Sequence, residues 1–191
     1  EVGAAGEGVQ RAQGGRRVLL VDANLRRPRL QEHWAGIEDK GLTTLLIGEG
    51  QLADLVAHTS VPNLDVLGSG PMTPNPAELL GSEAFLAFLN DAAQRYDQVI
   101  LDTSPVLIAS DPTVLATLVD GVVMVLRARA NSCGAARRAC GLLQSVSAHI
   151  FGIVLNAAQV TRGGYFREQL RTYYDYQPDG SGRGSPKSLP K

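Results

Sequence analysis

Runs of apolar residues along the chain outline the strands of a sheet. Four runs are short, nearly continuous in apolar character, rich in β-branched side chains and bounded by turn-forming residues. This pattern is typical of strands that are buried on both faces of a parallel sheet. A fifth run, at 64–67, alternates between apolar and polar residues and favours a strand nearer the edge. The four continuous runs are 18–21, 99–101, 122–126 and 150–155.

Helical patterns fill the intervals between these runs. Leucine and phenylalanine recur at spacings of three and four residues from 77 to 95, after Pro76, which suits the first turn of a helix. Further helices are predicted at 112–118 and at 135–146. Strands that alternate with helices of this length predict βαβ units with right-handed crossovers. The expected fold class is therefore α/β, with a doubly wound, mainly parallel sheet and helices on both faces.

The two ends of the chain differ from this middle part. Residues 1–15 are rich in glycine and lack apolar periodicity, so we expect a flexible lead-in there. Residues 177–191 are polar and rich in glycine, proline and serine, a composition that predicts disorder. The expected organisation is thus the lead-in, one α/β domain at 16–164, a tyrosine cluster at 165–176 and the disordered tail.

Composition and charge exclude several classes of function. The formal net charge of −1 gives no electrostatic reason to expect a nucleic-acid partner. No apolar run approaches the roughly 20 residues of a membrane-spanning helix, and no signal-peptide pattern is visible, so the expected location is cytoplasmic, without direct membrane insertion. The two cysteines, Cys133 and Cys140, are interpreted as small buried apolar residues in a reducing compartment.

Two of the predicted strands end in a carboxylate. Asp22 and Asp102 each follow an apolar run, and ligands of open α/β sheets bind beyond the carboxyl ends of the strands. Arg26 and Arg27 come soon after Asp22, and their guanidinium groups suit bidentate phosphate contacts. For the first segment alone, a strand followed by a solvated basic turn is an equally good interpretation. Two such strands in one chain favour a site for phosphate and a metal ion.

These motifs carry a resemblance to a known family. The run Val-Asp-Ala-Asn-Leu-Arg-Arg-Pro at 21–28 is similar to the Walker A′ motif of bacterial tyrosine kinases (BY-kinases), which serve polysaccharide export and are related in fold to the MinD/ParA ATPases. The resemblance extends over about residues 16–176 and implies a P-loop NTPase-like fold that uses ATP and Mg²⁺. Further family-like motifs lie at 41–48, 67–80, 96–102, 110–111, 119–121 and 152–156.

The resemblance also implies roles for individual residues. Asp22 resembles the Walker A′ aspartate, which serves Mg²⁺ and activates the attacking tyrosine hydroxyl, and Asp102 resembles the Walker B metal residue. Arg26 and Arg27 match family arginines near the phosphates and the subunit contacts. Asn156 resembles the asparagine that contacts the adenine base.

Asn24 departs from the family pattern, which more often has a second aspartate at this position of the Walker A′ motif. We assign Asn24 to the nucleotide site, because an amide can still accept a hydrogen bond from the metal shell. An amide cannot act as a base at neutral pH, so the catalytic role is weakened.

Four of the five tyrosines gather near the C-terminus, and the resemblance implies that they are phosphoacceptors. Packing along an amphipathic terminal helix is the alternative. In the family such a cluster is phosphorylated in trans within a ring-shaped homo-oligomer, at the inner face of the membrane, with a transmembrane polysaccharide co-polymerase as activating partner. The four residues are Tyr165, Tyr173, Tyr174 and Tyr176.

The phosphate-binding loop departs most from the family. A P-loop reads G-x-x-x-x-G-K-[ST], and the nearest match here begins at Gly3. Gly6 and Gly8 resemble the family's Gly-Glu-Gly and are candidate nucleotide contacts, but Val9 replaces the lysine and Gln10 replaces the hydroxyl residue. The short interval before the first apolar run indicates that the first strand and the P-loop helix are absent. A missing strand predicts an exposed sheet edge and lower stability.

Three functions therefore stay open at this point. The first is an ATP-dependent protein-tyrosine autokinase of capsule or exopolysaccharide production. The second is a catalytically inactive relative or fragment that acts as an interaction module or as a kinase substrate. The third is a MinD/ParA-like ATPase, against which the tyrosine cluster and the Asn-Leu-Arg-Arg-Pro run argue.

Overall fold

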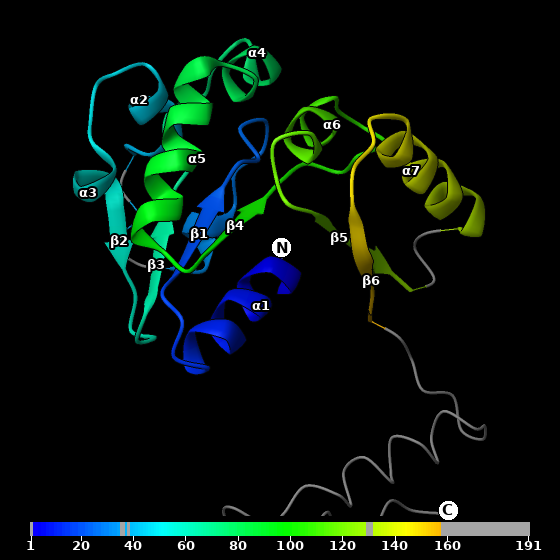
Figure 1. Cartoon of the computed structure of the whole chain (residues 1–191), viewed down its shortest axis with the longest axis horizontal. Helices are drawn as coiled ribbons and strands as arrows, with labels where there is room; N and C mark the ends of the chain where they lie inside the picture. Colours follow the sequence, from blue (N-terminus) through cyan, green and yellow to red (C-terminus); the bar gives the residue numbers. More distant parts are fainter. Residues whose placement is uncertain (1, 35–36, 38, 129–131, 158–191) are drawn as a thin grey trace, which may run out of the picture. The chain divides into compact units, whose positions relative to one another are not determined.

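The strands form two sheets. The computed structural model describes residues 2–34, 37, 39–128 and 132–157, and the first compact unit of the chain ends at Asn156. A four-stranded sheet has the order β2-β3-β1-β4, and a two-stranded sheet pairs β5 with β6 (Figure 1). The strands are β1 (Val18–Asp22), β2 (Val56–His58), β3 (Leu64–Leu67), β4 (Gln98–Asp102), β5 (Val122–Arg127) and β6 (Ile150–Asn156).

The sheets are mainly parallel, as predicted. β1 pairs in parallel with β3 and β4, and β5 pairs in parallel with β6. The short strand β2 is antiparallel to β3 and forms the edge, so β3 lies next to the edge as its alternating sequence indicated. β2 itself was not predicted, because three residues are too few to show a period.

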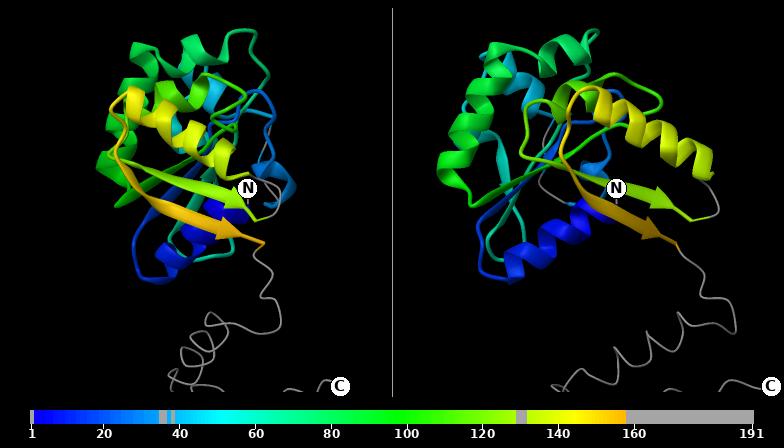
Figure 2. Two further views of the ribbon diagram at one scale, coloured as in Figure 1. Left: turned by 90° about the vertical axis from the view of Figure 1, so that its right-hand side faces the viewer. Right: turned by 45° about the vertical axis from the view of Figure 1, so that its right-hand side comes forward.

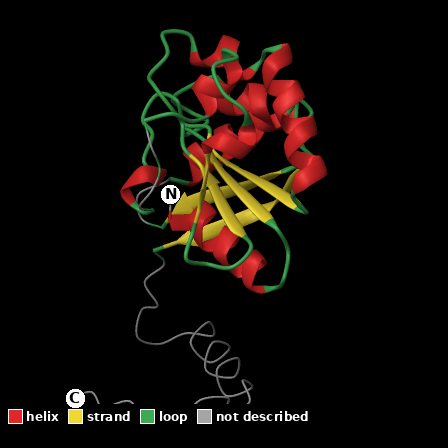
Figure 3. Cartoon of the chain, turned by 90° about the vertical axis from the view of Figure 1, so that its left-hand side faces the viewer, coloured by secondary structure: helices red, strands yellow, loops and turns green. Residues whose placement is uncertain are grey.

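Helices lie on both sides of the strand layer (Figures 2 and 3). The segment predicted as one helix at 77–95 forms two, α4 and α5, because Gly81 ends the first and Ser82 caps the second. The Ser82 hydroxyl oxygen accepts a hydrogen bond from the Phe85 N–H at 3.3 Å. The helices are α1 (Val2–Gln13), the 3₁₀ helix η1 (Leu30–Glu32), α2 (Leu42–Leu46), α3 (Leu52–Leu55), α4 (Pro76–Leu80), α5 (Glu83–Arg95), α6 (Asp111–Ala116) and α7 (Cys133–Ser145).

The strand β1 forms the centre of the hydrophobic core. All five of its residues are buried. Leu19 and Val21 belong to a cluster that includes Phe85 of α5, whereas Val18 and Leu20 belong to the cluster on the opposite face of the sheet. Alternation of side chains along the strand therefore supplies both layers of the core.

Helix α1 corrects the expected flexible lead-in. Residues 2–13 are helical, and Ala12 is buried against the face of the sheet formed by Val18 and Leu20. Ala4, Ala5 and Val9 pack on the same cluster. The prediction was wrong because the apolar residues here are small and lie between glycines, so the sequence shows only a weak helical period. None of the helices in the described part of the chain is long and apolar enough to span a membrane.

The two-stranded sheet corrects a second prediction. One face of β5 and β6 packs in a cluster with Ala139 and Leu143 of α7, but Val123, Val125 and Val154 are between a third and a half exposed. A continuous apolar run therefore did not mean burial on both faces here. Cys133 is also exposed rather than buried, while Cys140 is half-buried, and both are free thiols.

Candidate functional site

The ends of β1 and β4 bring the two predicted aspartates together. Asp22 and Asp102 are partners in the parallel register, and the N–H of Ala23 donates to the carbonyl oxygen of Asp102 at 2.8 Å. Leu20 and Ile100, two residues earlier in each strand, both belong to the cluster under α1. Since side chains alternate along a strand, Asp22 and Asp102 point to that same face of the sheet.

The carboxylate of Asp22 organises the loop that follows β1. It is completely buried, and its Oδ1 accepts a hydrogen bond from the Asn24 N–H at 3.1 Å. Its Oδ2 accepts from the N–H groups of Arg29 and Leu30, both at 2.9 Å. Hydrogen bonds to an ionised acceptor are stronger than neutral ones, so these contacts fix the course of the loop. Asp22 thus has a structural task that its sequence motif did not indicate.

Asn24 forms a turn within this loop. Its side chain is mostly buried, and its Oδ1 accepts a hydrogen bond from the Arg27 N–H at 3.3 Å. The carbonyl oxygen of Asn24 accepts from the same N–H at 3.1 Å. Such side-chain bonds to a nearby backbone group are typical of Asn in turns. The amide that departs from the family pattern therefore serves the local backbone.

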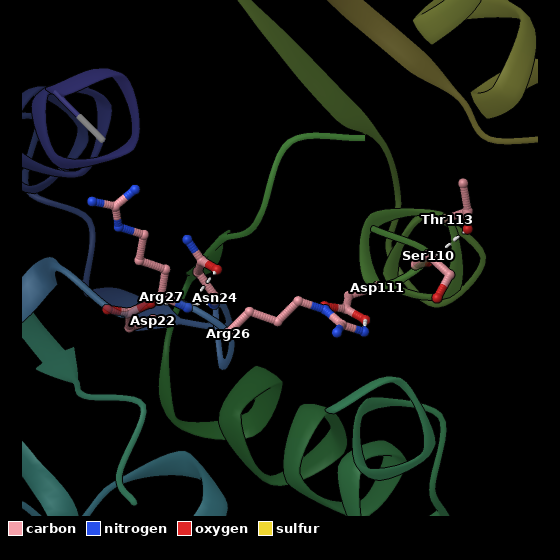
Figure 4. Close-up of polar contacts among 7 residues, drawn as sticks. All are labelled: Asp22, Asn24, Arg26, Arg27, Ser110, Asp111 and Thr113. Carbon is pink, nitrogen blue, oxygen red and sulfur yellow. Dashed lines mark hydrogen bonds and ion pairs between the residues drawn. The ribbon is translucent and has the colours of Figure 1, made fainter. Parts of the chain in front are cut away.

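The two arginines of the loop diverge, as Figure 4 shows. Arg26 forms a bidentate ion pair with Asp111, with Nε to Oδ2 at 2.7 Å and Nη2 to Oδ1 at 2.9 Å. The hydrogen bond and the charge of Asp111 raise the pKa of Arg26. Arg27 is exposed and points away from this pair.

Asp111 is a site residue to which sequence reasoning gave no role. It is the first residue of α6, and its carboxylate is completely buried. Thr113 Oγ1 donates to the carbonyl oxygen of Ser110 at 2.6 Å, in the first turn of the same helix (Figure 4). Ser110-Asp111 forms the family-like motif at 110–111. A carboxylate directly before Pro112, at a predicted helix start, was the signal that could have drawn attention to it.

The structure places Gly6, Gly8 and Asn156 in other elements. Gly6 and Gly8 lie inside helix α1, where Gly8 faces Leu64 and Ile100, so they form no phosphate-binding loop. Asn156 is the exposed last residue of β6 in the other sheet, and its carbonyl oxygen accepts from the Ala128 N–H at 2.8 Å. The four candidate phosphoacceptors, Tyr165, Tyr173, Tyr174 and Tyr176, lie outside the described residues.

The donor set suits Mg²⁺ better than it suits nucleotide phosphates. Asp22 and Asp102 offer the oxygen ligands that Mg²⁺ prefers. Beside them, Thr103 Oγ1 and Ser104 Oγ are buried and have no hydrogen-bond partner among the described residues. Across those same residues, no group of three or more His, Cys, Asp and Glu gathers. Among the described residues, the glycine-rich match at 3–10 is helical and contains no lysine.

The chain is similar in sequence to several known proteins. No family model matches the chain. It is 34% identical over 159 residues to the tyrosine-protein kinase YwqD of Bacillus subtilis, covering 83% of this chain and 67% of YwqD. It is 31% identical over 166 residues to the tyrosine-protein kinase CpsD of Streptococcus agalactiae, covering 86% of this chain and 69% of CpsD. Against the tyrosine-protein kinase Wzc of Salmonella typhi the identity is 31%, over 87% of this chain but 23% of Wzc.

Solved structures share the fold. The chimerical protein CapA2B2 superposes with a TM-score of 0.78 at 32% identity, over 81% of this chain and 69% of that chain. The VpsO kinase domain gives 0.75 at 35% identity, over 80% of this chain and 75% of that domain. The cell-division ATPase MinD of Pyrococcus furiosus gives 0.66 at 18% identity, over 89% of this chain and 72% of MinD, which shows likeness of fold alone.

Proposed function

The chain belongs to the family of bacterial tyrosine-protein kinases, and on this premise we propose that it is an Mg²⁺–ATP-binding kinase domain. Its reaction is the transfer of a phosphoryl group from ATP to tyrosines of its own C-terminal cluster, Tyr165, Tyr173, Tyr174 and Tyr176. It acts in capsule or exopolysaccharide production, in a homo-oligomer held at the inner face of the membrane by a transmembrane co-polymerase partner.

The pairing of Asp22 with Asp102 is the observation that supports this proposal most strongly. The two carboxylates end adjacent parallel strands on one face of the sheet. Both would hold Mg²⁺, which supplies neutralising charge to the nucleotide phosphates when it is bound. Asp22 also orders the loop that carries Arg27, and Asn156 at the end of β6 is the proposed contact of the adenine base.

A second candidate function is that of a catalytically inactive relative whose tyrosines are phosphorylated by another kinase. Its support is local to α1. Gly6 and Gly8 are helical. The sequence match that begins at Gly3 has Val9 where a P-loop has its phosphate-binding lysine. Loss of the lysine's hydrogen bond to a charged phosphate costs about 1.5–3 kcal/mol. In the same sequence match, Gln10 replaces the hydroxyl residue that binds the metal ion. Both candidates predict phosphotyrosine at the same cluster, so they differ in which protein transfers the phosphoryl group.

Nucleotide binding tests the first candidate. Calorimetric titration with ATP–Mg²⁺ should show binding to the wild type that Asp102→Asn weakens roughly tenfold or more, because one oxygen ligand loses its charge. Asp91→Asn is the matched control, since Asp91 is an exposed carboxylate on α5 that pairs with Arg95. Two outcomes would count against a kinase site at this position. One is that the wild type does not bind at millimolar nucleotide, and the other is that Asp102→Asn and Asp91→Asn bind with equal affinity.

Phosphoryl transfer separates the two candidates. The purified chain is incubated with ATP–Mg²⁺ alone, and in parallel with the CpsD kinase, and phosphotyrosine is mapped by mass spectrometry. Modification in the chain alone that disappears in Asp102→Asn supports the kinase. Modification only with CpsD, unchanged in Asp102→Asn, supports the inactive substrate.

A further inference from the structure

The two adjacent arginines of the loop after β1 have different environments. The guanidinium of Arg26 is bound through two nitrogens to Asp111. The guanidinium of Arg27 is exposed and makes no hydrogen bond or ion pair with any residue that the structure describes. The two arginines are neighbours in the chain, so their environments differ because their side chains contact different groups. The sequence resemblance implied that both lie near the phosphates and the subunit contacts.

Arg26 is held by its bidentate ion pair with Asp111. The Asp111 side chain has no exposed surface, and burying an unpaired carboxylate is strongly unfavourable. Arg26 supplies the compensating charge with the bidentate geometry that suits a carboxylate. Moving Arg26 onto a phosphate would leave the Asp111 charge buried without that partner. A ligand would therefore have to offset this penalty before it gained any contact.

Arg27 differs from Arg26 in its partners rather than in its exposure, since both arginines are exposed. Its backbone N–H is held by Asn24, through both the carbonyl oxygen and Oδ1. The loop on either side is fixed by Asp22, which accepts hydrogen bonds from Asn24, Arg29 and Leu30. Arg26 adds a further fixed point through Asp111. Arg27 thus presents a charged and exposed side chain from an ordered backbone, on the loop that begins at Asp22.

We propose that Arg27 is the arginine that binds the phosphate groups of the ligand, and that Asp111 is a positioning residue that withdraws Arg26 from this role. The proposal deepens the proposed function, since the ligand is a magnesium-bound polyphosphate at the ends of β1 and β4. Asp111 also links the loop after β1 to α6, the helix that precedes β5. The ion pair therefore joins the first sheet's ligand loop to the segment that leads into the second sheet.

The matched pair Arg26→Gln and Arg27→Gln tests the division of roles in the whole chain. Thermal unfolding and calorimetric binding of ATP–Mg²⁺ and of pyrophosphate–Mg²⁺ are measured on both. Arg27→Gln should leave the melting temperature unchanged and reduce affinity for both probes roughly tenfold or more, as expected for a lost charge-assisted contact. Arg26→Gln should lower the melting temperature clearly while affecting affinity less. Arg26→Lys, which keeps the charge, should recover part of that loss.

A double variant makes the positioning role falsifiable even if Arg26→Gln folds poorly. In Arg26→Gln with Asp111→Asn the buried charge is gone, so the melting temperature should rise above that of Arg26→Gln alone. No rise would overturn the role of Asp111. Equal losses of affinity in the two single variants, with an unchanged melting temperature for Arg26→Gln, would overturn the assignment to Arg27.

The two probes separate this inference from the proposed function. Pyrophosphate binding that Arg27→Gln weakens, without nucleotide binding, would support Arg27 as the anion ligand while the kinase proposal fails. Nucleotide binding that Asp102→Asn weakens and Arg27→Gln does not would support the kinase site and overturn the inference. Failure of both probes to bind the wild type would overturn the role of Arg27 together with the proposed function.

Discussion

The four-stranded and two-stranded sheets are built from similar apolar runs but are buried to different extents. Every residue of β1 is buried, because α5 and its neighbours cover one face and α1 covers the other. In β5 and β6, α7 packs on one face, and Phe151, Ile153 and Leu155 are each more than half exposed. An apolar run therefore identifies a strand, whereas the neighbouring elements decide how much of it is buried.

The strands at the open sides illustrate the same dependence. β4 has one hydrogen-bonded neighbour among the described strands, and all five of its residues are half-buried. β1 has a hydrogen-bonded neighbour on each side, and all five of its residues are fully buried. We expect the second sheet and the β4 edge to open more readily than the centre of the first sheet, since local stability follows buried apolar contact.

Leucine truncations in the two sheets should give the largest difference. Leu19→Ala removes a completely buried side chain from β1 and should destabilise the protein by about 2–5 kcal/mol. Leu155→Ala, the matched change in β6, removes a side chain that is 59% exposed, and the expected loss is about 1 kcal/mol or less. Unfolding in urea measures both. Similar losses would contradict the contrast between the sheets.

The buried carboxylate after β1 should come next in magnitude. Asp22→Asn keeps the size of the side chain but replaces a charged acceptor of three backbone N–H groups, so we expect a loss of about 2–3 kcal/mol. Asp54→Asn, at an exposed position of α3, is the control and should have little effect. Hydrogen exchange of the Arg29 and Leu30 amides should accelerate in Asp22→Asn but not in Asp54→Asn. Unchanged exchange would show that other contacts hold the loop.

Much of the fold could be predicted because strand and helix periods are properties of local sequence. The runs at 18–21 and 99–101, each followed by an aspartate, gave the paired strands β1 and β4 and brought Asp22 beside Asp102. Parallel pairing of strands fixes which residues meet, so this part of the site followed from the pattern and from the α/β topology.

The rest of the site depends on contacts between distant segments. The bond between Arg26 and Asp111 spans 85 residues, and no local period indicates it. Asp22 resembled a catalytic residue, but its three backbone hydrogen bonds depend on the path of the loop to Leu30. Helix α1 was missed since its interior glycines lower helix propensity by about 1 kcal/mol each, a deficit that packing against β1 and β4 offsets.

Polar bonds at the other end of the first sheet should have a smaller effect. Tyr96 Oη donates to Asp65 Oδ2 at 2.8 Å, which joins the end of α5 to β3. Burial, followed by the hydrogen bond to Asp65, raises the pKa of Tyr96. Tyr96→Phe should destabilise the protein by about 1 kcal/mol. The neutral phenol is the favoured form, so this difference should be present at pH 7 and should shrink at strongly alkaline pH. Urea unfolding at both pH values measures it, and a constant difference would contradict the role of the hydroxyl.

The smallest expected effect belongs to Asp97, at the same end of the first sheet. Its Oδ2 accepts from the backbone N–H of Arg17 at 2.8 Å, and its Oδ1 accepts from Nη2 of Arg17 at 3.2 Å. The backbone bond, followed by the side-chain bond, lowers the pKa of Asp97 below its ordinary value of 3.8. The folded state therefore favours the ionised form. Its contribution is complete above the ordinary pKa and is lost as the pH falls through the lowered value.

Asp97→Asn should consequently lower the melting temperature slightly at pH 7, and the difference from the wild type should diminish at pH values below about 4. High salt should reduce the part that comes from the exposed Arg17 guanidinium and leave the part from the backbone N–H, because salt screens exposed charges. Melting curves between neutral pH and pH 3, at low and high salt, measure both parts. A difference that stays constant over this range would show that the charge of Asp97 does not strengthen the contact between β4 and the segment before β1.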